Sequence, residues 1–292
     1  MTCLHQRTIC DTSAPARCNA ARTTTTHTYL SRQVHLRRRH DNASSRMVCR
    51  VQLRKSQSLP VPRCMEDMYE TLAIRLCDVA ETQTPPRKHL VGIAGMPGSG
   101  KTTAARHISD SMNNLWRQRH ASDEDCTGTL PMDGFHLTRR QLNVLPNPEE
   151  AYARRGAPWT FNAGAFLQAL LQLRQDGEGL FPSFDHAVGD PKEAEIHIEP
   201  HHRVVLIEGN YLLLDEEPWR GIKDIVNESW YVDSDVEEAM ERVYSRQIGN
   251  GVPPEVARKR IDTNDRLNAL QISATKERAT LVIPALPLCT EG

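Results

Sequence analysis

Eight consecutive residues have the types and the spacing of a phosphate-binding loop. The stretch from Gly95 to Thr102 (GMPGSGKT) fits the P-loop pattern G-x-x-x-x-G-K-[ST]. Gly98 and Gly100 permit positive φ angles and a close approach of the backbone to an anion, so that successive N–H groups form a concave nest. The ammonium group of Lys101 adds a full charge, and the hydroxyl of Thr102 can bind Mg²⁺. This chemistry predicts a site for a nucleoside triphosphate.

The residues on either side of the loop support this prediction. The apolar run His89–Ala94 predicts a buried strand, and the residues from Lys101 to about Arg119 predict a helix whose positive dipole end faces the anion. A chance match in a glycine-rich turn would not carry this context, so we prefer the functional interpretation. The expected nucleotide contacts are Gly95, Met96, Pro97, Gly98, Ser99, Gly100, Lys101, Thr102 and Thr103.

Two acidic residues follow predicted strands. In the segment Arg203–Asn210, an apolar run typical of a central parallel strand ends at Glu208. An acidic group at such a strand end can support bound Mg²⁺. Asp133 follows a short predicted strand that begins at Thr129. Ligands of open parallel sheets bind at the carboxyl ends of the strands, so Asp133 would lie across from the P-loop. Alternatively, Asp133 caps the next helix, and the residues alone leave both interpretations open.

Further polar side chains could contact a second substrate. The segment 137–158 is polar, interrupted by prolines and basic at Arg154 and Arg155, which suits either a substrate-covering segment or an exposed connection. Asp185, His186 and Asp190 flank the end of an aromatic strand and indicate recognition of a polar ligand. A lone histidine is more often structural, so this interpretation depends on other support.

The elements that must position these residues alternate along the chain. The pattern predicts helices over 65–80, 101–119, 162–174, 234–249 and 253–272, and strands over 89–94, 129–132, 181–186, 194–198, 203–208, 230–233 and 280–283. The strand 194–198 is expected at an edge. Ser234 and Glu237 form a predicted capping box for a helix that carries Arg242 and Arg246 on one face. At least four strand–helix alternations imply an α/β fold with a mainly parallel sheet and helices on both faces.

Composition divides the chain near residue 64. Residues 1–64 contain 11 Arg, one Lys and two Asp, whereas the remaining residues hold 24 basic and 35 acidic side chains, a formal net charge of −11. We expect 1–64 to be a basic disordered tail because it is poor in apolar residues. The tail could be a mitochondrial transit segment, a nucleic-acid or nuclear-import patch, or sequence upstream of a start at Met47 or Met65. Residues 65–292 are expected to form one domain.

Several protein classes are excluded or disfavoured by simple features. No apolar run approaches the ~18–20 residues of a membrane span, and the eight cysteines include no C-x-x-C pair, so neither a zinc site nor a disulfide framework is indicated. The absence of Asn-Lys-x-Asp argues against a guanine-specific switch. The absence of Leu-Ser-Gly-Gly argues against a transporter ATPase.

Several motifs of this chain occur in the same order as those of the phosphoribulokinase/uridine kinase group and resemble them. Within that group, the chain resembles the bacterial-type pantothenate kinases most of all. The resemblance extends from about Leu90 to Ile283. The matching segments are Asp133-Gly134-Phe135, Arg154–Pro158 with Phe161, Ser183–His186, Ile207–Asn210, Arg246, and Asn264 and Asn268 with Glu277–Ala279. The resemblance implies the three-layer fold of P-loop NTPases and an ATP-dependent kinase that phosphorylates a hydroxyl group of a nucleoside, a sugar or a pantothenate-like metabolite.

The resemblance also implies roles for single residues. Asp133 would accept the proton of the acceptor hydroxyl. Arg246, the lid arginine, would stabilise the transferring phosphoryl group, alone or with Arg242, and Lys101 would hold the triphosphate. Asp185 and His186 would bind the acceptor. Arg154 and Asn264 are further acceptor candidates, and Thr102 and Glu208 would serve Mg²⁺. The chain departs from pantothenate kinases by the short Gly249–Pro254 link after the lid arginine, and from uridine kinases by having Asp133-Gly134-Phe135-His136 in place of Asp-Ser-Phe-Tyr.

We therefore expect a kinase that uses ATP and Mg²⁺ and has a small hydroxyl-bearing substrate. A non-catalytic or regulatory ATP-binding protein is the alternative, and it would not need Asp133, His186 or Arg246. We expect a cytoplasmic protein, or a mitochondrial one if residues 1–64 are a transit segment. Neither a membrane nor a nucleic-acid partner is expected, and a homodimer is left open.

Overall fold

The computed structural model describes residues 62–185 and 188–287. Its helices are α1 (Met65–Thr82), α2 (Lys101–His120), α3 (Arg139–Leu142), α4 (Pro148–Ala153), α5 (Ala163–Asp176), α6 (Ile222–Ile225), α7 (Val236–Gly249), α8 (Pro254–Arg260) and α9 (Arg266–Ser273). Its strands are β1 (His89–Ala94), β2 (Thr127–Pro131), β3 (Gly179–Asp185), β4 (Asp190–Ile198), β5 (Val204–Gly209), β6 (Glu228–Val232) and β7 (Leu281–Ile283).

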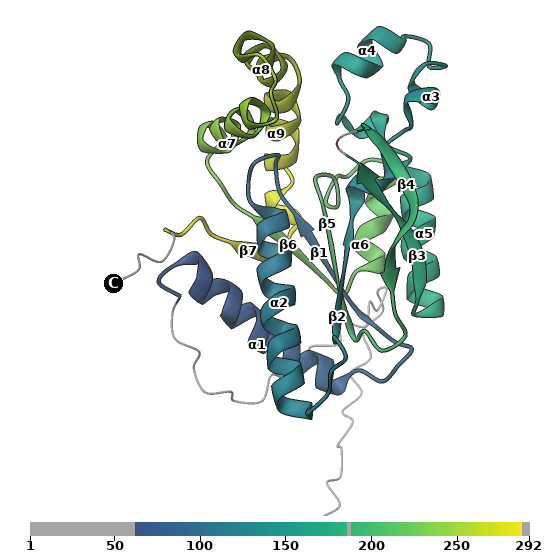
Figure 1. The fold of residues 1–292 in the computed structure, drawn as a ribbon, viewed down its shortest axis with the longest axis vertical. Coiled ribbons are helices and arrows are strands. Elements are labelled where there is room, and N and C mark those ends of the chain that lie inside the picture. The colour runs from purple at the N-terminus through teal and green to yellow at the C-terminus, as the bar shows by residue number, and fades with distance from the viewer. Residues whose placement is uncertain (1–61, 186–187, 288–292) are drawn as a thin grey trace, which may run out of the picture. The chain divides into compact units, whose positions relative to one another are not determined.

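Five of these strands form a parallel sheet in the order β2-β5-β1-β6-β7. Alternate residues of β1 and β5 enter different cores: Val91 and Leu206 pack with α1 and α2, whereas Leu90 and Val205 pack with the core that includes α5 and α6. Burial on both faces explains why these strands are continuous apolar runs in the sequence. The result is the predicted three-layer α/β fold, with α1 and α2 on one face and α5 and α6 on the other (Figure 1).

One prediction about an edge strand is confirmed, and one about a helix cap is wrong. The stretch 194–198 is an edge strand, but it is part of the longer β4, which begins at Asp190 and pairs antiparallel with β3 in a separate two-stranded sheet. The cap of α7 is Asp235, whose carboxylate accepts from the N–H groups of Glu237 at 2.8 Å and Glu238 at 3.1 Å. The neighbouring Ser234 hydroxyl instead accepts from Arg242 at 3.0 Å. Both Ser and Asp are good caps, so the local pattern did not decide between them.

The predicted helix 253–272 contains an irregularity. It comprises α8, a π-helical turn over Ile261–Asp265, and α9. Such turns insert an extra residue and often occur at functional sites. Figure 1 shows α7, α8 and α9 as one group of helices and α3 and α4 as another, both at the same end of the sheet.

Candidate active site

The P-loop has the geometry of an anion site. Gly98 and Gly100 have φ angles of 80° and 91°, in the region that favours glycine. A Cβ atom at Gly98 would lie 2.1 Å from the carbonyl oxygen of Ala239 in α7, so glycine also permits close packing there. Gly100 precedes α2 and offers no side chain to cap it, which leaves the first N–H groups of the helix for a ligand.

A second observation indicates that a polar ligand completes this loop. The hydroxyl oxygen of Ser99 is buried and has no hydrogen-bond partner among the described residues. Buried polar atoms are nearly always paired, so a phosphate oxygen is a fitting partner for this group. Lys101 is half-buried at the start of α2, and Thr102 and Thr103 are exposed. The residues present therefore fit a triphosphate.

Glu208 lies at the carboxyl end of β5, directly beside the P-loop. The hydroxyl of Thr102 donates to both carboxylate oxygens at 3.0 Å. Burial raises the pKa of Glu208. The positive charge of Lys101 and the hydrogen bond from the Thr102 hydroxyl oppose this rise, whereas the negative charge of Asp133 adds to it. A buried carboxylate with a raised pKa gains from a bound cation, so these residues fit Mg²⁺ held by one carboxylate, one hydroxyl, phosphate oxygens and water. The described residues hold no group of three or more His, Cys, Asp or Glu that could bind a metal without a ligand's help.

Asp133 lies at the same edge of the sheet as Glu208. Strand β2 pairs with β5 so that Pro131 is opposite Glu208, and Asp133 follows in a 3-10 turn, Met132–Phe135. The capping interpretation is wrong, because this turn has no side-chain cap and α3 is capped by Thr138, which accepts from the N–H of Gln141 at 3.1 Å. The carboxylate of Asp133 is partly buried, and its charge acts on Glu208.

The two arginines of α7 have different surroundings. Arg242 donates to the carbonyl oxygen of Gly98 at 3.2 Å, so it holds α7 against the P-loop. Arg246 is exposed. Burial raises the pKa of Asp265 in the π-helical turn, and the charge of Arg246 is among the contributions that oppose this rise. Arg246 therefore lies on the side of α7 that faces α8 and α9.

The segment before α5 is tied to the C-terminal helices by buried polar side chains. Arg154 donates to the carbonyl oxygen of Thr263 at 3.2 Å and to the Asn268 side chain at 3.1 Å. Asn268 donates to the Asn264 side chain at 3.2 Å, and Asn264 donates to the carbonyl oxygen of Arg155 at 3.0 Å. Asn264 is fully buried, so in this state it binds the chain itself.

The remaining acceptor candidates lie in and near the β3–β4 hairpin. The Asp185 carboxylate accepts from the N–H of Val188 at 3.1 Å and so stabilises the turn, whereas His186 lies outside the described residues. Asp190 accepts from the N–H of Arg139 at 2.7 Å and from Arg155 at 3.4 Å.

Sequence reasoning did not assign a role to two residues near Asp133. The ring of His136 lies 4.0 Å from that of Phe161 and 4.5 Å from that of Phe184, with its Nδ1 2.8 Å from the carbonyl oxygen of Asp133. Tyr211 donates to the carbonyl oxygen of Gly156 at 2.5 Å. Their positions, three residues after Asp133 and Glu208 respectively, were the only signal in the sequence.

Comparison with known proteins gives consistent matches. A family model described as "Phosphoribulokinase / Uridine kinase family" matches residues 90–287. A Schizosaccharomyces pombe protein named "Putative uridine kinase C227.14" is 35% identical over 226 residues, which cover 76% of this chain and 92% of that protein. The "ATP-dependent kinase-like protein notR'" of Aspergillus versicolor is 38% identical over 160 residues, covering 52% of this chain and 93% of that protein.

A solved structure matches as well. The "putative fructose transport system kinase" from Silicibacter sp. TM1040 is 31% identical, with a TM-score of 0.62 over 73% of this chain and 98% of that chain. No helix in the described part of the chain is long and apolar enough to cross a membrane.

Proposed function

The chain belongs to the phosphoribulokinase/uridine kinase family, and on that premise we propose that it transfers the γ-phosphate of ATP to a hydroxyl group of a small metabolite. The observation that carries the proposal is the hydrogen bond from Thr102 of the P-loop to Glu208. The charge of Asp133 also acts on this site, because it contributes to the raised pKa of Glu208. A phosphate-binding loop, a metal-supporting carboxylate and a second carboxylate that can take a proton are the groups that phosphoryl transfer to a hydroxyl requires.

Each group has a proposed task. Lys101 and the N–H groups at the start of α2 bind the phosphates, and Thr102 and Glu208 hold Mg²⁺, which neutralises phosphate charge when bound. Asp133 orients the acceptor hydroxyl and takes its proton. Arg246 stabilises negative charge that develops on the transferring group, while Arg242 keeps α7 against the loop.

The acceptor is proposed only as a class. The names of the relatives point to different compounds, uridine in one case and a fructose transport system in another. We propose a nucleoside, a sugar or a pantothenate-like compound, bound near Asp133, Asp185 and His186. Arg154 and Asn264 act by holding the segment around Arg155, as their mutual hydrogen-bond network supports.

A phosphate-transfer screen tests this function. The full chain would be incubated with ATP, Mg²⁺ and nucleosides, sugars or pantothenate-like compounds, and products would be identified by mass spectrometry. We expect one class to be phosphorylated and the Lys101→Ala variant to be inactive, with a circular dichroism spectrum like that of the wild type. ATP binding without a phosphorylated product from any class would favour the non-catalytic ATP-binding alternative.

A further inference from the structure

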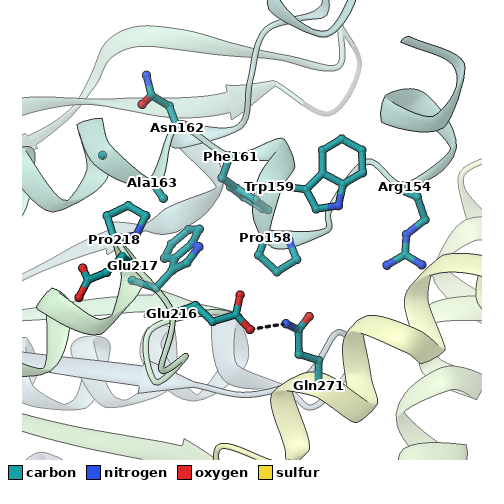
Figure 2. Close-up of a pocket in the computed structure, with 12 residues that line it drawn as sticks. Arg154, Pro158, Trp159, Phe161, Asn162, Ala163, Glu216, Glu217, Pro218 and Gln271 are labelled. Carbon is teal, nitrogen blue, oxygen red and sulfur yellow. Dashed lines mark hydrogen bonds between the residues drawn. The ribbon is translucent and has the colours of Figure 1, made fainter. Parts of the chain in front are cut away.

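A pocket of about 430 Å³ lies outside the phosphoryl-transfer groups. It is formed by the segment that leads into α5, the loop before α6, and Gln271 of α9 (Figure 2). Its lining includes neither the P-loop nor Asp133 nor Glu208. Its volume lies within the range of roughly 300–1,000 Å³ that is typical of small-molecule sites.

Aromatic rings form the walls of this pocket. Trp159 is 47% exposed and therefore offers a free indole face, whereas Phe161 and Trp219 are 5% and 3% exposed. The indole N–H of Trp219 donates to none of the described residues and keeps contact with solvent. A ligand that carries an oxygen atom would accept from this N–H in place of water.

The charged side chains at the rim of the pocket indicate which charge a ligand should carry. Asp215 forms ion pairs with Arg220 at 2.7 Å and with Arg278, and these contacts lower the pKa of Asp215 to about 2. The adjacent Glu216 is exposed, its carboxylate forms no ion pair with a described residue, and that carboxylate accepts one hydrogen bond, from the Gln271 amide at 3.4 Å. Glu216 therefore places a solvated negative charge, without a paired cation among the described residues, beside the aromatic walls.

Arg154 also lines the pocket but forms no ion pair with Glu216. Its guanidinium group donates to two neutral acceptors, the Thr263 carbonyl oxygen and the Asn268 side chain, and these hold its positive charge in place at that end of the pocket. Figure 2 shows this group on the opposite side of Trp159 and Pro158 from Glu217, while Glu216 faces Gln271.

We propose that this pocket binds a small amino alcohol. Its ammonium group would contact Glu216 and the face of Trp159, because charge-assisted hydrogen bonds and cation–π contacts both favour a cation there. Its hydroxyl oxygen would accept from the Trp219 indole. The amino alcohol is either the remote end of the phosphate acceptor or a separate effector, since Phe161 connects the pocket to His136 beside Asp133.

Two probes of nearly equal shape test the site. Phenylglycinol carries an ammonium group, a hydroxyl and a ring, and styrene glycol replaces the ammonium by a second hydroxyl. Isothermal titration calorimetry on the full chain without nucleotide should show phenylglycinol binding roughly tenfold tighter than styrene glycol. Glu216→Gln should remove this preference and leave styrene glycol unchanged. Glu124→Gln, which removes an exposed charge in the loop before β2, is the matched control.

Equal affinity for the two probes, no binding of either probe, or an unchanged preference in Glu216→Gln would overturn the proposal. Because nucleotide is absent, these outcomes do not depend on the proposed phosphoryl transfer. Turnover measurements then identify the source of the ligand. If Glu216→Gln raises the KM only of amino-bearing acceptors, the pocket holds the acceptor. If phenylglycinol changes the turnover without competing with the acceptor, the ligand is a separate effector.

Discussion

Replacing Asp133 by asparagine removes one negative charge and one proton acceptor from the proposed centre. Asparagine has nearly the same size and can still accept a hydrogen bond from a hydroxyl group. It cannot take the proton as the phosphoryl group arrives. General base catalysis contributes roughly 10²–10⁴-fold to the rate, so turnover should fall by that factor, or about 3–5 kcal/mol in activation free energy.

The surroundings of Asp133 make two further expectations specific. The charge of Asp133 raises the pKa of Glu208, so the variant should ionise Glu208 at a lower pH. Binding of Mg²⁺ with ATP, which needs the ionised carboxylate, should therefore persist to lower pH in Asp133→Asn than in the wild type. Because Thr138 rather than Asp133 caps the next helix, the variant should not lose the ~1 kcal/mol of stability that a lost cap would cost.

Three measurements on one variant separate these effects. Steady-state kinetics gives the turnover, calorimetry at several pH values gives the affinity for ATP with Mg²⁺, and thermal unfolding gives the stability. Asp123→Asn is the charge-matched control, because Asp123 is exposed in the loop before β2, at the amino end of the sheet. It should leave all three quantities unchanged. A destabilised Asp133→Asn variant with normal turnover would remove this residue from the mechanism.

Four other changes have expected outcomes. Arg246→Ala should lower turnover by roughly 10³–10⁵-fold with little change in the ATP dissociation constant, whereas Arg242→Ala, which frees the Gly98 carbonyl, should chiefly weaken ATP binding in the same calorimetric titration. Glu208→Gln should abolish Mg²⁺-dependent turnover yet raise the melting temperature. Burial raises the pKa of Glu208, so the folded wild type loses stability as pH rises above the ordinary pKa of about 4.3. Melting curves from pH 4 to 8 should therefore show that the difference in melting temperature between Glu208→Gln and the wild type grows above that pH. A chain that begins at Met65, the first residue of α1, should fold and keep the ATP turnover of the full chain, as circular dichroism and a kinetic assay would check.

The sequence predicted the parts of this site that lie on regular elements. β1, the P-loop and α2 follow from glycine spacing between an apolar run and a helical pattern, and Glu208 follows from the end of an apolar strand. Side chains that depend on distant partners could not be predicted in this way. Excluding Asp133 as a helix cap needed the observed cap at Thr138, and the pairing of β4 with β3 needed the hairpin's own register.

The segment around Arg155, which we propose lies beside the acceptor, was the hardest to predict because it is held by contacts between segments about 110 residues apart. Arg154 reaches Asn268, Asn268 reaches Asn264, and Asn264 reaches the carbonyl oxygen of Arg155. Gln247, the residue after Arg246, donates to Asp265 at 3.1 Å in the same π-helical turn. Hydrogen bonds between buried polar side chains fix the relative positions of those side chains more strictly than apolar packing does. The π-helical turn that holds the segment around Arg155 is therefore also attached to α7, which carries Arg246, and a displacement of one should displace the other.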